Sequence, residues 1–215
     1  MGWLQETLKS SIGKKSVMAV TGLTLGLFIA AHLFGNLHII QGRAALTAFS
    51  IRLHNLGGLL HLFEISLLLL FVLHIGFGLR LFLDNRQAKP CHYAVTGSQR
   101  RLRLGSPIIP YTGLVLLLFL AYHLASFRFG PPTPAGDLVA ASLAQPATGA
   151  FYLAALLALT LHLHHGLWSL CQTLGLNHPK YEALLEKGAA AAGILIGALF
   201  MLIPLLALFW PDFLS

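Results

Sequence analysis

The feature that most constrains this chain is a set of five apolar segments, each long enough to cross a lipid bilayer. A helix rises about 1.5 Å per residue, so about 20 apolar residues span a hydrocarbon core of about 30 Å. The segments cover approximately residues 16–40, 57–83, 107–129, 149–174 and 188–210. We therefore predict an all-α integral membrane protein with five transmembrane helices, and a single membrane domain over residues 1–215.

The composition agrees with this fold class. Hydrophobic residues make up 56% of the chain and charged residues only 10%, whereas a soluble domain has roughly a quarter charged residues. The two cysteines, Cys91 and Cys171, are far apart and form no C-x-x-C or C-x-x-C-H signature. Covalent haem attachment and iron–sulfur ligation by this chain are therefore not expected.

The distribution of Lys and Arg predicts the orientation in the membrane. Eleven of these residues fall on the side that holds the N-terminus, and three, Arg43, Arg52 and Arg128, fall on the other. By the positive-inside rule, the N-terminus is expected in the cytoplasm and the C-terminus outside a bacterial cytoplasmic membrane. Residues 1–15 favour a short interfacial helix.

The same rule places the strongly basic segment 84–106 in the cytoplasm as a loop. This loop either determines topology alone or docks a peripheral partner or anionic lipid. Nucleic acid is not an expected ligand, because the basic residues stand where a membrane protein normally has them. No internal repeat is evident.

Each of the first four apolar segments contains one deep histidine, and the fifth contains none: these are His32, His74, His123 and His162. Polar side chains at such depth are costly and usually mark a functional interior. A hydrogen-bonded core histidine would explain any one of them alone, but four, one in each segment, favour a shared role. Helix rise places His32 and His123 at one level near the outer face. It places His74 and His162 at a second level nearer the cytoplasm.

Two facing imidazoles at one level suit the axial positions of a haem iron, whereas zinc and di-iron sites use more ligands, typically with carboxylates. We therefore predict an outer haem ligated by His32 and His123 and an inner haem ligated by His74 and His162. A small residue follows each of these histidines on the same helical face, which would leave room for a porphyrin; these residues are Gly35, Gly78, Ser126 and Gly166.

Other polar residues of the segments have less certain roles. Glu64 is the one acidic residue inside a segment, and it is either a proton relay near the outer haem or a structural hydrogen-bond partner for a neighbouring helix. His164 and His165 flank His162 and compete with it as ligand candidates, although His162 best matches the level of His74. The roles of His38, His54 and His61 stay open.

Four stretches of the sequence resemble a known family: "SIGKKSVMAVTGLTLGLFIAAHLFGNL", "FEISLLLLFVLHIGFGLRL", "YTGLVLLLFLAYHLASFRFG" and "LHLHHGLWSLCQTLG". The chain is similar to the cytochrome b membrane-anchor subunit of succinate dehydrogenase and fumarate reductase, in the bacterial type with one five-helix anchor and two haems. The resemblance covers about residues 11–175 and implies the same two histidine pairs for two haem b groups.

The resemblance also implies partners and an activity. The expected partners are a flavoprotein with FAD and an iron–sulfur subunit on the cytoplasmic face. The anchor would pass electrons between the iron–sulfur subunit and a membrane quinone, with menaquinone expected over ubiquinone. An oligomer of the whole complex is compatible with this assignment, and the physiological direction of the reaction stays open.

Three alternatives stay open from the residues. The first is another quinone-linked membrane cytochrome b, without soluble flavoprotein partners. The second is a transporter whose intramembrane histidines pass a metal or protons. The third is a pure anchor whose haems serve no electron transfer.

Overall fold

The computed structural model describes residues 2–87, 105–176 and 178–210. Five of the described helices are long and apolar enough to cross a membrane. They are α2 (Ser11–Asn36), α4 (Gly58–Gln87), α5 (Gly105–His123), α7 (Pro146–Thr173) and α8 (Glu182–Phe209). These bounds differ from the predicted ones by a few residues, and the predicted fold class, an all-α multi-pass membrane protein, is confirmed.

Shorter helices join the long ones. The predicted N-terminal helix is present as α1 (Trp3–Lys9), but α3 (Arg43–His54) and α6 (Ala135–Ala144) were not predicted, because neither is long enough to cross a bilayer. α2 continues into the 3-10 turn η1 (Leu37–Gln41), and α5 continues into the π-helical turn η2 (Leu124–Arg128). Much of the connecting chain at one end of the bundle is thus helical.

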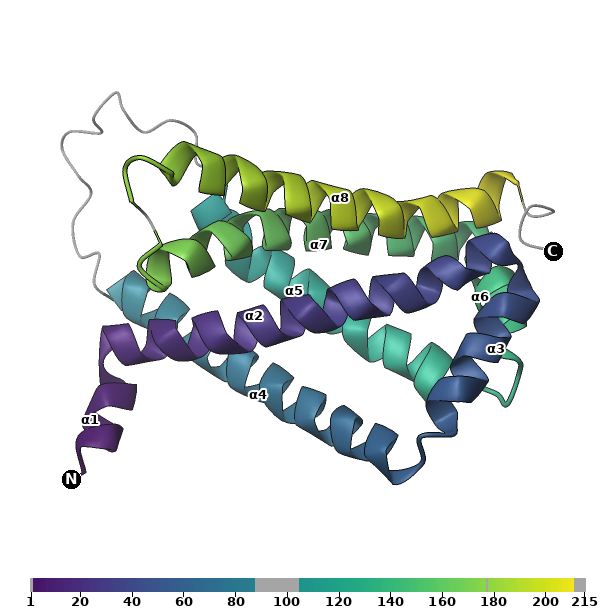
Figure 1. Ribbon diagram of the computed structural model, residues 1–215, viewed down its shortest axis with the longest axis horizontal. Coiled ribbons are helices and arrows are strands. Elements are labelled where there is room, and N and C mark those ends of the chain that lie inside the picture. Colours follow the sequence, from purple (N-terminus) through teal and green to yellow (C-terminus); the bar gives the residue numbers. More distant parts are fainter. Residues whose placement is uncertain (1, 88–104, 177, 211–215) are drawn as a thin grey trace.

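The two ends of the bundle are distinct in Figure 1. The N-terminus, the last turn of α4, the first turn of α5 and the link from α7 to α8 lie at one end, here called the N-terminal end. Helices α3 and α6 lie at the opposite end, here called the capped end. Residues 84–87 and 105–106, which were predicted to belong to the basic loop, are helical instead. Residues 88–104 of that loop are not among the described residues. The same holds for the C-terminal segment, which was predicted to lie on the outer side of the membrane.

Helices α7 and α8 pack closely through two glycines four residues apart. A Cβ at Gly193 would lie 2.9 Å from the backbone nitrogen of His164, and one at Gly197 would overlap Oγ1 of Thr160. Small residues at this spacing allow close approach of helices in membranes. A cluster of buried side chains then ties α7 and α8 to the capped end: Ile39, Leu46, Leu143, Tyr152, Ile203 and Ala207.

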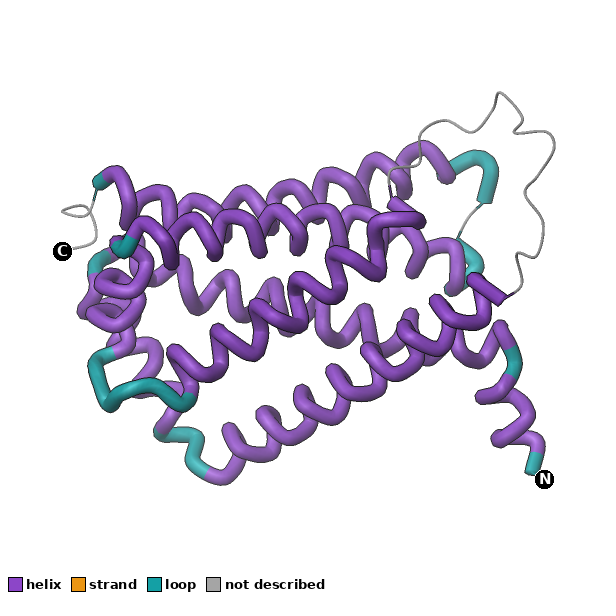
Figure 2. The backbone as a smooth tube through the Cα atoms, turned by 180° about the vertical axis from the view of Figure 1, so that it is seen from behind, coloured by secondary structure: helices purple, strands orange, loops and turns teal. Residues whose placement is uncertain are grey.

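Helix α4 is the loosest member of the bundle. It has no buried residue along its 30-residue length, and Figures 1 and 2 show it diverging from α2 toward the capped end. The chain thus forms two units of one pattern, long helix, short cap and long helix (α2–α3–α4 and α5–α6–α7), with α8 packed on the second.

Candidate functional site

The four deep histidines come together in the two pairs that the sequence predicts. The imidazole of His32 in α2 lies with its centroid 5.8 Å from that of His123 in α5. The imidazole of His74 in α4 lies 6.4 Å from that of His162 in α7. We call the first, near the capped end, the outer pair, and the second, nearer the N-terminal end, the inner pair.

These separations would let both imidazoles of a pair hold one metal ion. A metal–imidazole nitrogen bond is about 2 Å, so two imidazoles that bound the same ion would have centroids roughly 6 Å apart. The ring planes of the two pairs meet at 88° and 65°. Each ring would keep its bond at either angle, because it can rotate about that bond.

Hydroxyl groups hold the two rings of the inner pair. Oγ1 of Thr21 lies 3.1 Å from Nδ1 of His74, and Oγ1 of Thr112 lies 3.2 Å from Nδ1 of His162. Thr21 and Thr112 are the buried residues of polar type in the described part of the chain, with exposed fractions of 4% and 7%. The helix that faces each histidine therefore presents a buried oxygen to the same ring nitrogen.

The hydroxyls of Thr21 and Thr112 also make hydrogen bonds to carbonyl oxygens of their own helices. Thr21 donates to the carbonyl oxygen of Val17 at 2.7 Å, and Thr112 donates to that of Ile109 at 3.0 Å. With its proton in that bond, each hydroxyl oxygen can accept from the ring, an arrangement that favours the tautomer of His74 and His162 with the proton on Nδ1. In that tautomer the lone pair is on Nε2, which makes no hydrogen bond to a described residue. This is the form in which histidine binds a metal.

The outer pair is held differently. Nδ1 of His123 lies 3.0 Å from the hydroxyl of Tyr152 in α7, whereas His32 has no hydrogen bond from its ring to a described residue. An aromatic ring one turn earlier lies against each imidazole: Phe28 and His32 have centroids 5.6 Å apart, and so do Phe119 and His123. The π-helical turn η2 begins directly after His123, and such turns are frequent at functional sites.

The matching contacts point to an internal repeat in the sequence, so the expectation that the chain has none is wrong. Residues 21–33 (TGLTLGLFIAAHL) and 112–124 (TGLVLLLFLAYHL) are identical at 9 of 13 positions, including the threonine, phenylalanine and histidine just described. Residues 63–79 and 151–167, around His74 and His162, are identical at 7 of 17 positions. Each histidine pair thus joins equivalent residues of the two units, as a pseudo-twofold arrangement requires.

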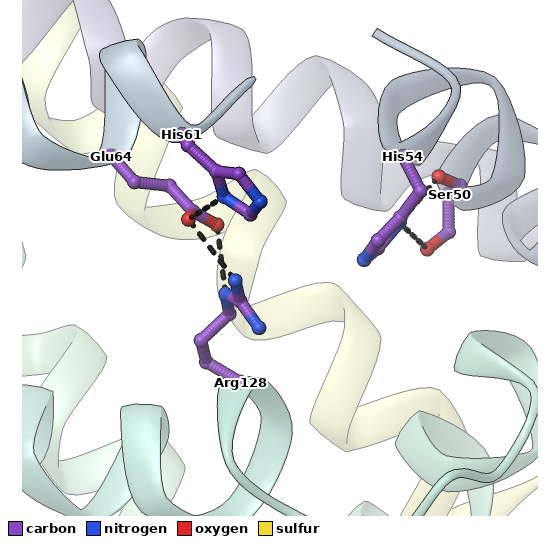
Figure 3. A network of polar contacts seen from close by, with 5 residues as sticks. All are labelled: Ser50, His54, His61, Glu64 and Arg128. Atoms are coloured by element: carbon purple, nitrogen blue, oxygen red, sulfur yellow. Dashed lines mark hydrogen bonds and ion pairs between the residues drawn. The ribbon is translucent and has the colours of Figure 1, made fainter. Parts of the chain in front are cut away.

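Glu64 makes an ion pair between helices (Figure 3). Its two carboxylate oxygens accept from Nε and Nη2 of Arg128 at 2.7 and 3.1 Å, and His61 lies 3.3 Å from one of them. Because Arg128 ends η2, the pair ties the loose end of α4 to the α5–η2 helix. This is the structural contact that the sequence left as one alternative, and the relay role stays a prediction.

The predicted space beside each ligand is present at some positions only. A Cβ added at Gly166 meets nothing within 4 Å, and one at Gly78 meets only the end of Met18. At Gly35 the expectation is wrong, because the ring of Phe49 from α3 fills that space, 2.6 Å from where an added Cβ would stand. The remaining room lies beside the inner pair rather than at Gly35.

The other histidines make local contacts. Nδ1 of His38 lies 3.1 Å from the carbonyl oxygens of Phe34 and Gly35, and Nδ1 of His54 lies 2.8 Å from that of Ser50. The backbone of His164 faces α8 at Gly193. Among the described residues, no group of three or more His, Cys, Asp or Glu side chains is arranged to hold a metal ion.

Sequence reasoning missed the partners of the ligand candidates, Thr21, Thr112 and Tyr152. The signal for the threonines was available as the repeated Thr-Gly-Leu that precedes His32 and His123 by the same interval. Tyr152 has no such signal, because Glu64 stands at the equivalent position of the first unit.

Comparisons with known proteins do not assign the chain to a family. No protein-family model matches the chain, and neither a curated protein nor a solved structure was found to be similar to it.

Proposed function

We propose that this chain is a di-haem cytochrome b membrane anchor of a succinate:quinone oxidoreductase, either a succinate dehydrogenase or a quinol:fumarate reductase. The observation that carries the proposal is the inner pair, in which two imidazoles have centroids 6.4 Å apart and each has a threonine hydroxyl against Nδ1, so that Nε2 of each ring is the nitrogen left for a ligand. Two such nitrogens close together are best satisfied by a shared cation.

The donor set fits haem. His74 and His162 would hold the inner haem, and His32 and His123 the outer one, with Fe bound between equivalent residues of the two units. Haem b, when bound, supplies reversible one-electron transfer. The chain would hold both groups between its helices, with a threonine hydroxyl against each inner imidazole and a phenylalanine ring against each outer one.

The membrane, orientation and partners are the finer part of the proposal and depend on the family resemblance. We place the chain in a bacterial cytoplasmic membrane with its N-terminal end in the cytoplasm. Basic residues support this orientation, because Lys14 and Lys15 lie near the start of α2, and Arg80 and Arg86 near the end of α4. A flavoprotein with FAD and an iron–sulfur subunit would dock there. A quinone, with menaquinone favoured, would react at the membrane, where Glu64 is the candidate proton relay.

Purification of the chain from its own membranes in a mild detergent tests the proposal. We expect a reduced-minus-oxidised spectrum with b-type bands, together with co-purifying flavoprotein and iron–sulfur subunits. A red protein without these subunits would replace the proposal by another quinone-linked cytochrome b. A colourless protein would contradict both assignments and favour a transporter.

A further inference from the structure

The inner pair differs from the outer pair in how its rings are supported. Nδ1 of each inner imidazole makes a hydrogen bond with a buried threonine hydroxyl, at 3.1 and 3.2 Å. In the outer pair, His123 has a phenol as its partner and His32 has no partner among the described residues. The sequence repeat places the threonines so that each serves the histidine of the next long helix in its own unit.

We propose that Thr21 and Thr112 are positioning residues that fix the ring orientations of His74 and His162 and would lower the reduction potential of the haem that these histidines hold. This inference rests on the proposed function only in its requirement that haem binds at the inner pair. It names two residues that neither the resemblance nor the sequence reasoning assigned.

The physical reason is the charge that the hydrogen bond places on the ligand. An imidazole that donates from Nδ1 becomes a more basic ligand at Nε2. A more basic ligand favours the higher charge state of the iron, so two such bonds lower the potential. Each threonine is itself fixed, because its hydroxyl donates to a carbonyl oxygen of its own helix.

The geometry leaves little freedom for another acceptor. Thr21 and Thr112 are the buried polar residues of the described chain, and a Cβ at the next residue, Gly22, would lie 3.2 Å from Cε1 of His74. The ring thus lies against the helix at the Thr-Gly step. Loss of the hydroxyl would leave a buried N–H without a partner, and loss of a ligand's hydrogen-bond partner weakens metal binding by about 10- to 100-fold.

The test uses the full chain in its native membranes, with the variants Thr21→Val and Thr112→Val, which keep the side-chain shape and lose the acceptor. Optical redox titration gives the potential of each haem, and electron paramagnetic resonance reports the ring orientation. The inner signal is identified as the one lost in His74→Ala. The matched control is Thr24→Val, one turn along α2, whose hydroxyl donates only to the carbonyl oxygen of Val20.

We expect each valine variant to raise the inner potential and the double variant to raise it further, with the outer potential unchanged. Thr21→Ser and Thr112→Ser should restore wild-type values. An inner potential and resonance signal that change no more than in Thr24→Val would overturn the inference. If the valine variants lose the inner haem and the serine variants retain it, the inference is supported. If the serine variants lose the inner haem as well, the threonines serve only packing and the inference is overturned. Absence of haem from the wild-type chain would instead refute the proposed function.

Discussion

Gly22 lies against His74 so closely that an added Cβ would stand 3.2 Å from Cε1 of the ring. The equivalent contact in the second unit is looser, since a Cβ at Gly113 would stand 3.7 Å from Cε1 of His162. The glycine after each threonine therefore lets an imidazole approach the backbone of the neighbouring helix, and the two units differ in how much space remains.

The Gly22→Ala variant should disturb the inner pair, because the new methyl group pushes His74 away from Thr21. We expect a loss of about 10-fold or more in retention of the inner haem, by analogy with loss of a ligand's hydrogen-bond partner. Gly113→Ala should have a smaller effect. Gly26→Ala, where an added Cβ meets nothing within 4 Å, is the control and should bind haem like the wild type. Equal haem content in all three variants would contradict the predicted contact.

The Tyr152→Phe variant removes the partner of His123 and keeps the aromatic ring. Among the described residues, this is the one hydrogen-bond partner of a ring of the outer pair. We therefore expect a changed reduction potential and a changed paramagnetic resonance signal for the outer haem alone. Redox titration with electron paramagnetic resonance gives the measurement. A shift confined to the inner haem would show that the two levels have been assigned to the wrong pairs.

The ion pair between Glu64 and Arg128 should stabilise the loose end of α4. Glu64→Gln and Arg128→Gln should each lower the thermal stability in detergent. A double-mutant cycle should give a coupling free energy on the order of 1 kcal/mol. The coupling is small because both side chains are more than a third exposed. Strict additivity of the two single effects would argue against a direct interaction. Quinone-linked turnover in Glu64→Gln separately tests the relay role.

The contact between α7 and α8 should tolerate no added atoms. In Gly197→Ala the new Cβ would meet the side chain of Thr160 within the contact, and overpacking of this kind costs about 1–3 kcal/mol. We expect a lower unfolding temperature in detergent. Gly188→Ala, in the same helix but with nothing within 4 Å of its Cβ, should be as stable as the wild type or slightly more so. Equal melting of both variants would refute the predicted close packing.

The long helices and the histidine pairs could be predicted from sequence because both depend on simple lengths. A bilayer requires about 20 apolar residues per crossing, and helix rise converts the position of His32 or His162 into a depth. The short helices α3 and α6 do not cross the membrane, so the same reasoning treated them as loops.

The partners of the histidines could not be predicted in this way, because they depend on which helix faces which. Thr21 looks like any other small polar residue until α4 is placed beside α2. The crowding of Phe49 against Gly35 likewise depends on α3, whose existence was not predicted. The repeated Thr-Gly-Leu was the one sequence signal that pointed to the threonines.

The central claim is that two pairs of imidazoles each hold one haem iron. The most direct measurement is the ratio of protohaem to chain in the purified protein, together with the magnetic circular dichroism of the ferric iron in the near infrared. The account predicts two haems per chain, both with two imidazole ligands, and one haem per chain in either His74→Ala or His32→Ala. A preparation without protohaem, or irons bound by side chains other than these four histidines, would contradict it.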